Sequence, residues 1–303
     1  MQSSIVNASG AAALLSLLTA LPAEATPFTF NTGGVTNLMA TATRPSSPGK
    51  FEIESADDFF LTSGTSITSA TFTGLLTGAA NIGEVRVEIY RVFSADSNVA
   101  RTSGPPTFST PEVPTRVNSP SDVEFADRDT ATGNLSFTTT LLNASFPAAN
   151  SIMPMGIHPQ PGQTTGGNGP VTGQEVQFNV NFTTPFDLPA DHYFFVPQVE
   201  IIDPAGEFFW LSGTRPLVPS PFPPGVTDLQ EWTRDQFLDP DWLRVGSDIV
   251  GPTPATAPTF NAAFSLTGVV PEPASLSLLG AALAGMSGLG WWRQRRRQSA
   301  QPA

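Results

Sequence analysis

The chain contains no cysteine, one lysine (Lys50) and two histidines among its 303 residues. The lack of cysteine excludes disulfides, a thiol nucleophile, Cys-ligated zinc, iron–sulfur clusters and covalently attached haem. Two histidines cannot supply a three-histidine metal site, and they leave few candidates for a His-based triad. His192 lies in an apolar run and is expected to pack at a strand end, whereas His158 precedes Pro159 in a loop and is expected to be exposed.

Basic residues are scarce as well, with 14 Lys and Arg against 26 Asp and Glu and a net charge of −12. A chain without a basic stripe is not expected to bind nucleic acid. The acidic balance is compatible with Ca²⁺, which takes carboxylate and carbonyl oxygens as ligands. The sequence has no Gly-x-Ser-x-Gly elbow, phosphate-binding loop or His-Glu-x-x-His motif. We therefore predict no enzymatic activity and no catalytic residues, with calcium as the only cofactor to consider.

The sequence also shows little helical periodicity. Apolar and polar residues alternate in many of its segments instead. Val85, Val87 and Ile89 alternate with charged residues, which is typical of a strand with one face on a core and one face in water. Similar patterns predict further strands at 51–54, 58–61, 67–72, 135–141, 176–182, 194–202, 208–211 and 260–266. Ten or so strands of this kind predict an all-β fold, an antiparallel β-sandwich resembling a jelly roll, with a core built largely from the 22 phenylalanines.

Long segments rich in proline and glycine separate some of these strands. Residues 103–120, 154–173 and 216–224 have too many prolines or glycines for a sheet interior and predict loops. The one helix-like piece is Asp228–Phe237, and 251–258 reads as a loop before the last strand. We therefore predict one β-sandwich body over residues 26–268.

The N-terminus has the features of an export signal. Residues 11–21 form an apolar run that is too short to span a bilayer, and Pro22 ends it. Ala23 and Ala25 then form an Ala-x-Ala cleavage pattern, so residues 1–25 are predicted to be a signal peptide removed by signal peptidase. Residues 1–10 lack the Lys or Arg with which such a peptide usually begins.

The C-terminal segment 269–303 has three parts in a fixed order. The tripeptide Pro271, Glu272 and Pro273 comes first, and an uncharged stretch from Ala274 to Trp292 follows. That stretch would measure roughly 28 Å as a helix, enough to cross a hydrocarbon core of about 30 Å. A basic cluster ends the segment and is expected to stay on the cytoplasmic side; its members are Arg293, Arg295, Arg296 and Arg297.

This order resembles the PEP-CTERM sorting signal of exopolysaccharide-producing Gram-negative bacteria. The resemblance implies that Glu272 between two prolines is recognised by an exosortase, which processes the tail. It further implies a precursor anchored in the inner membrane by one transmembrane helix, with the body in the periplasm, followed by transfer to the cell surface or the extracellular space. The body also looks like the β-sandwich regions common in such exported proteins, which carry no particular activity with them.

Two acidic groups are open to interpretation as calcium sites. Asp122, Asp127 and Asp129 lie in one acidic segment with Gly133, which has the look of a Ca²⁺ loop without the spacing of an EF-hand. The alternative is a solvated acidic turn. Asp57 and Asp58 can likewise be read as a strand-entry turn or as a pair of metal ligands.

Tryptophans beside carboxylates suggest a second class of function. Trp232 and Trp242 lie near Asp235, Asp239 and Asp241, a combination that could form a sugar-binding groove or the acid pair of a glycoside hydrolase. The alternative is that both rings are core anchors. We expect a non-enzymatic extracellular matrix or cell-surface protein that contacts exopolysaccharide, with a carbohydrate-active hydrolase as the first alternative and a structural surface protein without a ligand as the second.

Overall fold

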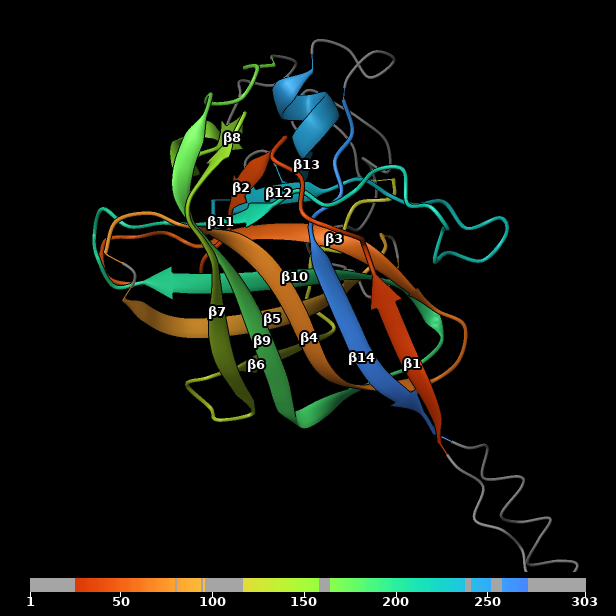
Figure 1. Cartoon of the computed structure of the whole chain (residues 1–303). Coiled ribbons are helices and arrows are strands. Elements are labelled where there is room, and N and C mark those ends of the chain that lie inside the picture. The colour runs from red at the N-terminus through yellow and green to blue at the C-terminus, as the bar shows by residue number, and fades with distance from the viewer. Residues whose placement is uncertain are drawn as a thin grey trace, which may run out of the picture. The chain divides into compact units, whose positions relative to one another are not determined.

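The computed structural model describes residues 25–79, 81–93, 95, 117–157, 164–237, 241–251 and 258–271. Figure 1 shows two sheets whose strands cross one another. All of their strands, and the cores that they enclose, lie in one compact unit, Thr26–Pro271. This unit therefore contains what it needs to fold by itself.

The first sheet has eight strands, in the order β1-β14-β4-β11-β2-β8, with β9 pairing β4 and β7 pairing β9. All of its pairs are antiparallel except β2 with β8. Its strands are β1 (Thr26–Asn31), β2 (Ala40–Ala42), β4 (Thr65–Leu76), β7 (Leu135–Ala148), β8 (Ser151–Ile152), β9 (Val171–Leu188), β11 (Phe208–Leu211) and β14 (Phe264–Val270).

The second sheet has six antiparallel strands, in the order β13-β12-β3-β10-β5-β6. They are β3 (Ile53–Leu61), β5 (Ile82–Arg91), β6 (Ala126–Asp129), β10 (Asp191–Ile201), β12 (Trp232–Asp235) and β13 (Leu243–Arg244). Two helical turns, η1 (Pro154–Gly156) and η2 (Val245–Val250), complete the described elements.

Phenylalanine rings from both sheets fill the space between them. Phe72 and Phe178 stack at a centroid distance of 4.9 Å, and Phe195 of the second sheet stacks on Phe264 of the first at 5.0 Å. All four rings are buried. Each buried ring removes about 150–250 Å² from water, so this core supplies the cohesion that a chain without disulfides needs.

The two-sheet architecture confirms the prediction of a β-sandwich. The described strands number fourteen, and two of them, β7 and β9, have 14 and 18 residues. An eight-stranded jelly roll therefore accounts for only part of this arrangement. The predicted signal peptide and transmembrane segment lie outside the described residues, apart from Ala25 at the edge. Within the described part of the chain, no helix has the length and apolar character to cross a bilayer.

The helix predicted at Asp228–Phe237 is wrong, because this segment contains strand β12. Trp232 pairs with Ala56 of β3, and Asp235 pairs with Ile53. Pairing with an open edge of β3 satisfies the backbone of this segment through contacts far away in sequence, and such tertiary contacts override a weak local helical preference.

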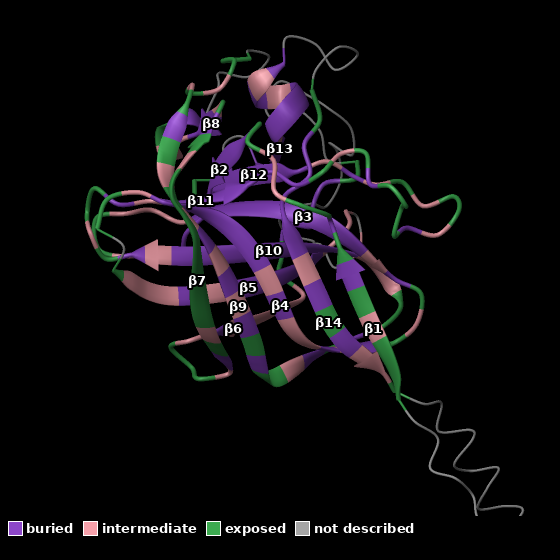
Figure 2. Ribbon diagram, viewed as in Figure 1, coloured by how far each residue is buried: buried purple, intermediate pink, exposed green. Residues whose placement is uncertain are grey.

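The expectation that the charged face of β5 lies in water holds only in part, because Glu84 and Arg86 are partly exposed whereas Glu88 is buried. Val85, Val87 and Ile89 face the core between the sheets as predicted, but Glu88 and Tyr90 on the opposite face are buried too. The segment that carries β12 and Trp242 packs against this face and forms a smaller core there with Phe194. In Figure 2 strands β3 and β10 of this sheet are mostly purple, whereas β7 is mostly green.

Candidate functional site

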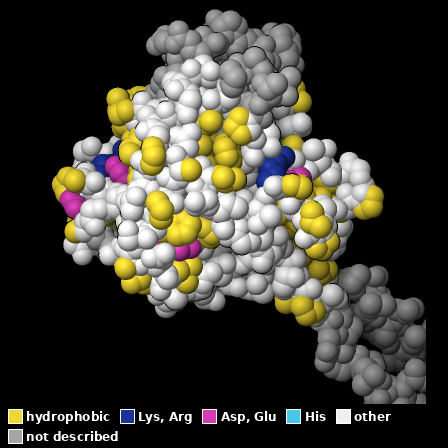
Figure 3. Space-filling model, turned by 45° about the horizontal axis from the view of Figure 1, so that its top comes forward, with side chains coloured by type: hydrophobic (Ala, Val, Ile, Leu, Met, Phe, Trp, Pro, Cys, Tyr) yellow, Lys and Arg dark blue, Asp and Glu magenta, His cyan; other side chains and the backbone are white. Residues whose placement is uncertain are grey.

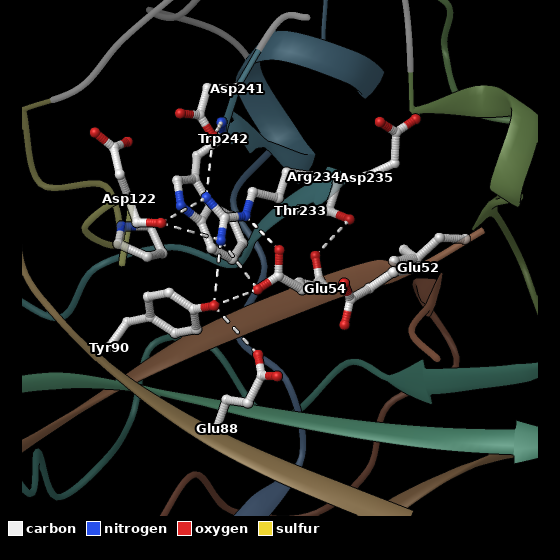
Figure 4. Close-up of polar contacts among 12 residues, drawn as sticks. Glu52, Glu54, Glu88, Tyr90, Asp122, Thr233, Arg234, Asp235, Asp241 and Trp242 are labelled. Carbon is white, nitrogen blue, oxygen red and sulfur yellow. Dashed lines mark hydrogen bonds and ion pairs between the residues drawn. The ribbon is translucent and has the colours of Figure 1, made fainter. Parts of the chain in front are cut away.

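A buried ionic cluster gathers around Arg234 on the covered face of the second sheet (Figure 4). The guanidinium of Arg234 donates to both carboxylate oxygens of Glu54 and, at 3.3 Å, to Oδ1 of Asp241. It also lies 4.3 Å from the ring centre of Trp242 and donates to the backbone carbonyl of Asp122. Arg234 thus ties together strand β3, strand β12 and two loops.

Tyr90 and Glu88 extend this cluster along β5. The Tyr90 hydroxyl donates to Glu54 Oε1, and it lies 3.2 Å from Glu88 Oε2 and 3.2 Å from Arg234 Nη2. Burial, together with the nearby Glu54 carboxylate, raises the pKa of Glu88 well above its usual range. The raised pKa favours the neutral form of Glu88, which lessens the negative charge that the single guanidinium has to balance.

The chemistry of the cluster is that of a structural clamp. A planar guanidinium that grips a carboxylate with two bonds and stacks on an indole is held in one geometry. Every charged member of the cluster is buried, so these groups interact with one another and not with water.

Trp232 and Trp242 are both buried, with 2% and 1% of their surfaces exposed. As the structure places them, neither indole offers an open face on which a sugar could stack, and their burial favours the interpretation as core anchors. Asp235 points away from the cluster and accepts a hydrogen bond from the Phe237 amide at 2.8 Å. Asp239 lies outside the described residues.

The three residues suggested for calcium occupy different structural positions. Asp122 is buried in the loop that meets Arg234, and Asp127 lies on β6. Asp129 accepts a hydrogen bond from the Thr132 amide, and its own amide donates to Asn134. These bonds, with Gly133 at a φ of +77°, build the turn from β6 to β7. Among the described residues, no group of three or more His, Asp and Glu side chains is arranged to hold a metal ion.

Asp57 and Asp58 are consecutive in the middle of strand β3, so their side chains point to opposite faces and do not form a chelating pair. Asp57 Oδ2 accepts from the Ala262 amide, while Asp58 lies 2.6 Å from Nε2 of His192, which packs as expected at the start of β10. Glu231 is buried near Asp57, and its burial raises its pKa to about 8. His158 lies outside the described residues.

The outer face of the first sheet is the opposite of these buried sites, because it is exposed or half-exposed and uncharged over most of its area. Its central row crosses five neighbouring strands, and printed pairs place every member beside the next. The row consists of Thr138, Asn179, Thr71, Ser265 and Asn31. With strands about 4.8 Å apart, it extends for roughly 19 Å.

A second row of paired residues lies beside the first on the same five strands: Ser136, Asn181, Ser69, Thr267 and Thr29. A third, shorter row contains Thr140, Gln177 and Thr73. We call these three rows the hydroxyl–amide face. On β9, β4 and β14 the alternate residues that point into the core are apolar, for example Val180, Ala70 and Leu266, whereas Thr139 and Leu141 of β7 are exposed. Figure 3 shows charged side chains as few, separate spots on the view that it presents.

A groove of about 300 Å³ lies at one end of the hydroxyl–amide face. Asn31, Thr71, Thr73, Gln177 and Ser265 of the face line it together with Glu175, Leu142 and the loop 33–35. Leu142 is half exposed, as is its neighbour Leu141. Burial raises the pKa of Glu175, the carboxyl group in this lining.

The fold and these sites define a class: a mostly β, sandwich-like protein with a buried ionic cluster and an open sheet face that is polar and largely uncharged. The chain also matches a family model, the PEP-CTERM protein-sorting motif, over residues 269–296. This match confirms the resemblance of the tail and marks the chain as an exosortase substrate that is sorted for export to the cell surface. Comparison with curated proteins and with solved structures gave no significant match.

The sorting residues follow the last strand directly. Strand β14 ends at Val270, and Pro271 is the last described residue of the chain. Glu272, Pro273 and the four arginines lie outside the described residues, as does Ala23 of the predicted cleavage site.

Sequence reasoning missed Glu54, Tyr90 and Arg234 as a unit. Glu54 is the second residue of β3, a strand that also contains Asp57 and Asp58, so its charge did not single it out. Its partner stands 180 positions away in the chain, so no local pattern could identify it.

Proposed function

We propose that this exported protein is a non-enzymatic component of the cell surface or extracellular matrix that associates with exopolysaccharide. The observation that carries the proposal is the hydroxyl–amide face, an extended surface of neutral hydrogen-bonding groups on a chain with a net charge of −12. Hydroxyls and amides both donate and accept, as polysaccharide hydroxyls do.

The hydrolase alternative has less support. Glycoside hydrolysis needs two carboxyl groups on either side of a bound sugar. Asp241 is buried against Arg234, and Asp235 holds the backbone at Phe237. Neither arrangement leaves the carboxyl group facing an open groove.

Co-sedimentation of residues 26–271 with exopolysaccharide from the source cells tests the proposal. We expect binding with Ca²⁺ and equally with EDTA, since the face needs no cation, and no release of reducing sugar. Binding lost in EDTA would favour the acidic segment 122–129 instead. Reducing-sugar release that Asp241→Asn abolishes would favour the hydrolase, and a lack of any binding would leave a structural surface protein.

A further inference from the structure

We infer that the hydroxyl–amide face binds a neutral, hydroxyl-rich glycan chain lying across strands β7, β9, β4, β14 and β1, with the groove beside Leu142 as one end of the site. This inference rests on the proposed function and deepens it, because it names the face and the class of polymer.

Charge selects the class of polymer. None of the paired residues in the three rows is charged, so the face has no cation with which to pair a uronate, sulfate or phosphate group. The whole chain is strongly acidic, which repels an anionic polymer at long range. A neutral glycan needs no cation on the face and is not repelled by the negative charge of the chain.

The rows also present their groups in a regular and partly ordered array. Oγ1 of Thr71 and Oγ of Ser265 lie 2.7 Å apart in a hydrogen bond, and Nδ2 of Asn179 donates to Thr140 at 3.3 Å. Each single hydrogen bond exchanged with water contributes only modestly, about 1 kcal/mol. A long polymer that contacts several positions of a row at once sums these small terms, and an extended flat array is suited to that kind of binding.

The groove adds an apolar contact to the hydrogen bonds of the rows. The half-exposed side chain of Leu142 offers an apolar surface to the C–H face of a sugar ring, and the Glu175 carboxyl can accept bonds from its hydroxyls. At about 300 Å³ the groove is at the small end of ligand sites, which fits a chain end or a single branch unit.

A second copy of the chain is a poorer match for this face. Protein interfaces usually have an apolar, often aromatic, centre. The central row has hydroxyls and amides where such a centre would lie, and the aromatic residues of these strands, such as Phe72 and Phe178, point into the core.

Two nearly isosteric sets of substitutions test the inference in residues 26–271. Thr71→Val with Ser265→Ala removes both partners of one hydrogen bond, so no polar group loses its partner. Asn179→Asp keeps the shape but adds a negative charge and removes two donors. The matched control is Thr62→Val with Ser46→Ala, the same chemical change at two exposed positions away from the face. Circular dichroism and thermal unfolding verify that each variant is folded.

Binding is measured to the source exopolysaccharide, to dextran and cellulose as neutral glycans, and to alginate as an anionic one. We expect neutral binding that is insensitive to salt, weakened at least tenfold in both face variants and unchanged in the control. Wild-type binding that the face variants retain would overturn the assignment of the face while leaving the proposed function intact. Binding to alginate alone would overturn the neutral class. Self-association without glycan binding, lost on Thr71→Val with Ser265→Ala, would assign the face to a second copy and overturn both.

Discussion

At the scale of single residues, the buried Glu231 makes the stability of the folded protein depend on pH. Its carboxyl group is fully buried, and its pKa in the folded protein is about 8 against 4.5 for a free side chain. The folded state therefore keeps a proton that the unfolded chain loses above about pH 4.5, so the stabilising effect is complete at low pH and disappears as the pH rises through 8. Asp57 acts in the same direction, because burial and then Asp58 and Glu231 raise its pKa.

We predict that the free energy of unfolding of residues 26–271 falls by a few kcal/mol between pH 5 and pH 8. Glu231→Gln removes this titrating group, so the free energy of unfolding should fall less between pH 5 and pH 8. Urea unfolding at both pH values measures the effect, with Asp187→Asn as a control at an exposed carboxyl. A Glu231→Gln protein whose stability declines as steeply as the wild type would refute the assignment.

At the scale of elements, Arg234 holds the segment of β12 and Trp242 onto the second sheet. Arg234→Met should cost about 3–5 kcal/mol of stability, because it leaves the buried Glu54 and Asp241 carboxylates without their cation. Arg234→Lys should fall between this variant and the wild type, since lysine keeps the charge but loses the fork and the stacking. The control is Arg86, a partly exposed arginine that forms ion pairs with Glu84, Glu52 and Glu88; because solvent screens its charge more than that of Arg234, Arg86→Met should cost less than Arg234→Met. Equal losses in denaturant titrations of Arg86→Met and Arg234→Met would contradict the clamp.

How far sequence predicts structure also depends on the element. The strands of the first sheet were predictable because Val176, Phe178 and Val180 alternate with polar residues, and a two-residue period is a local signal. The hydroxyl–amide face was not, because its rows depend on register between strands as far apart as β1 and β14. β12 was mistaken for a helix for the same reason: the edge of β3 that pairs with it is encoded about 180 residues earlier.

At the scale of the whole molecule, the tail determines where the folded body goes. Changing Glu272 of the tripeptide to Ala should keep the full-length precursor in the membrane fraction, because the exosortase no longer recognises its substrate. Gln298→Ala, outside the matched residues 269–296, is the control and should be released as the wild type is. Cell fractionation with antibodies against the body distinguishes the two. Release of the Glu272→Ala protein at the wild-type level would show that the tripeptide is dispensable.

The pairing of β1 with β14 joins the two ends of the body, so the first sheet is complete only when both ends are present. Residue 26 pairs with residue 270, so β1 at the start of the body cannot pair with β14 until the end of the body has been synthesised. Pairings between residues this far apart in sequence form slowly, and until β14 is present, β1 and residues 66–72 of β4 lack the partner that β14 provides. The tripeptide follows β14 in the chain without a spacer, so by the time the sorting sequence is complete the whole sheet has been synthesised. Position in the chain thereby makes the sorting sequence a marker of a finished domain, and a chain truncated anywhere within the body lacks both the closing strand and the signal for release.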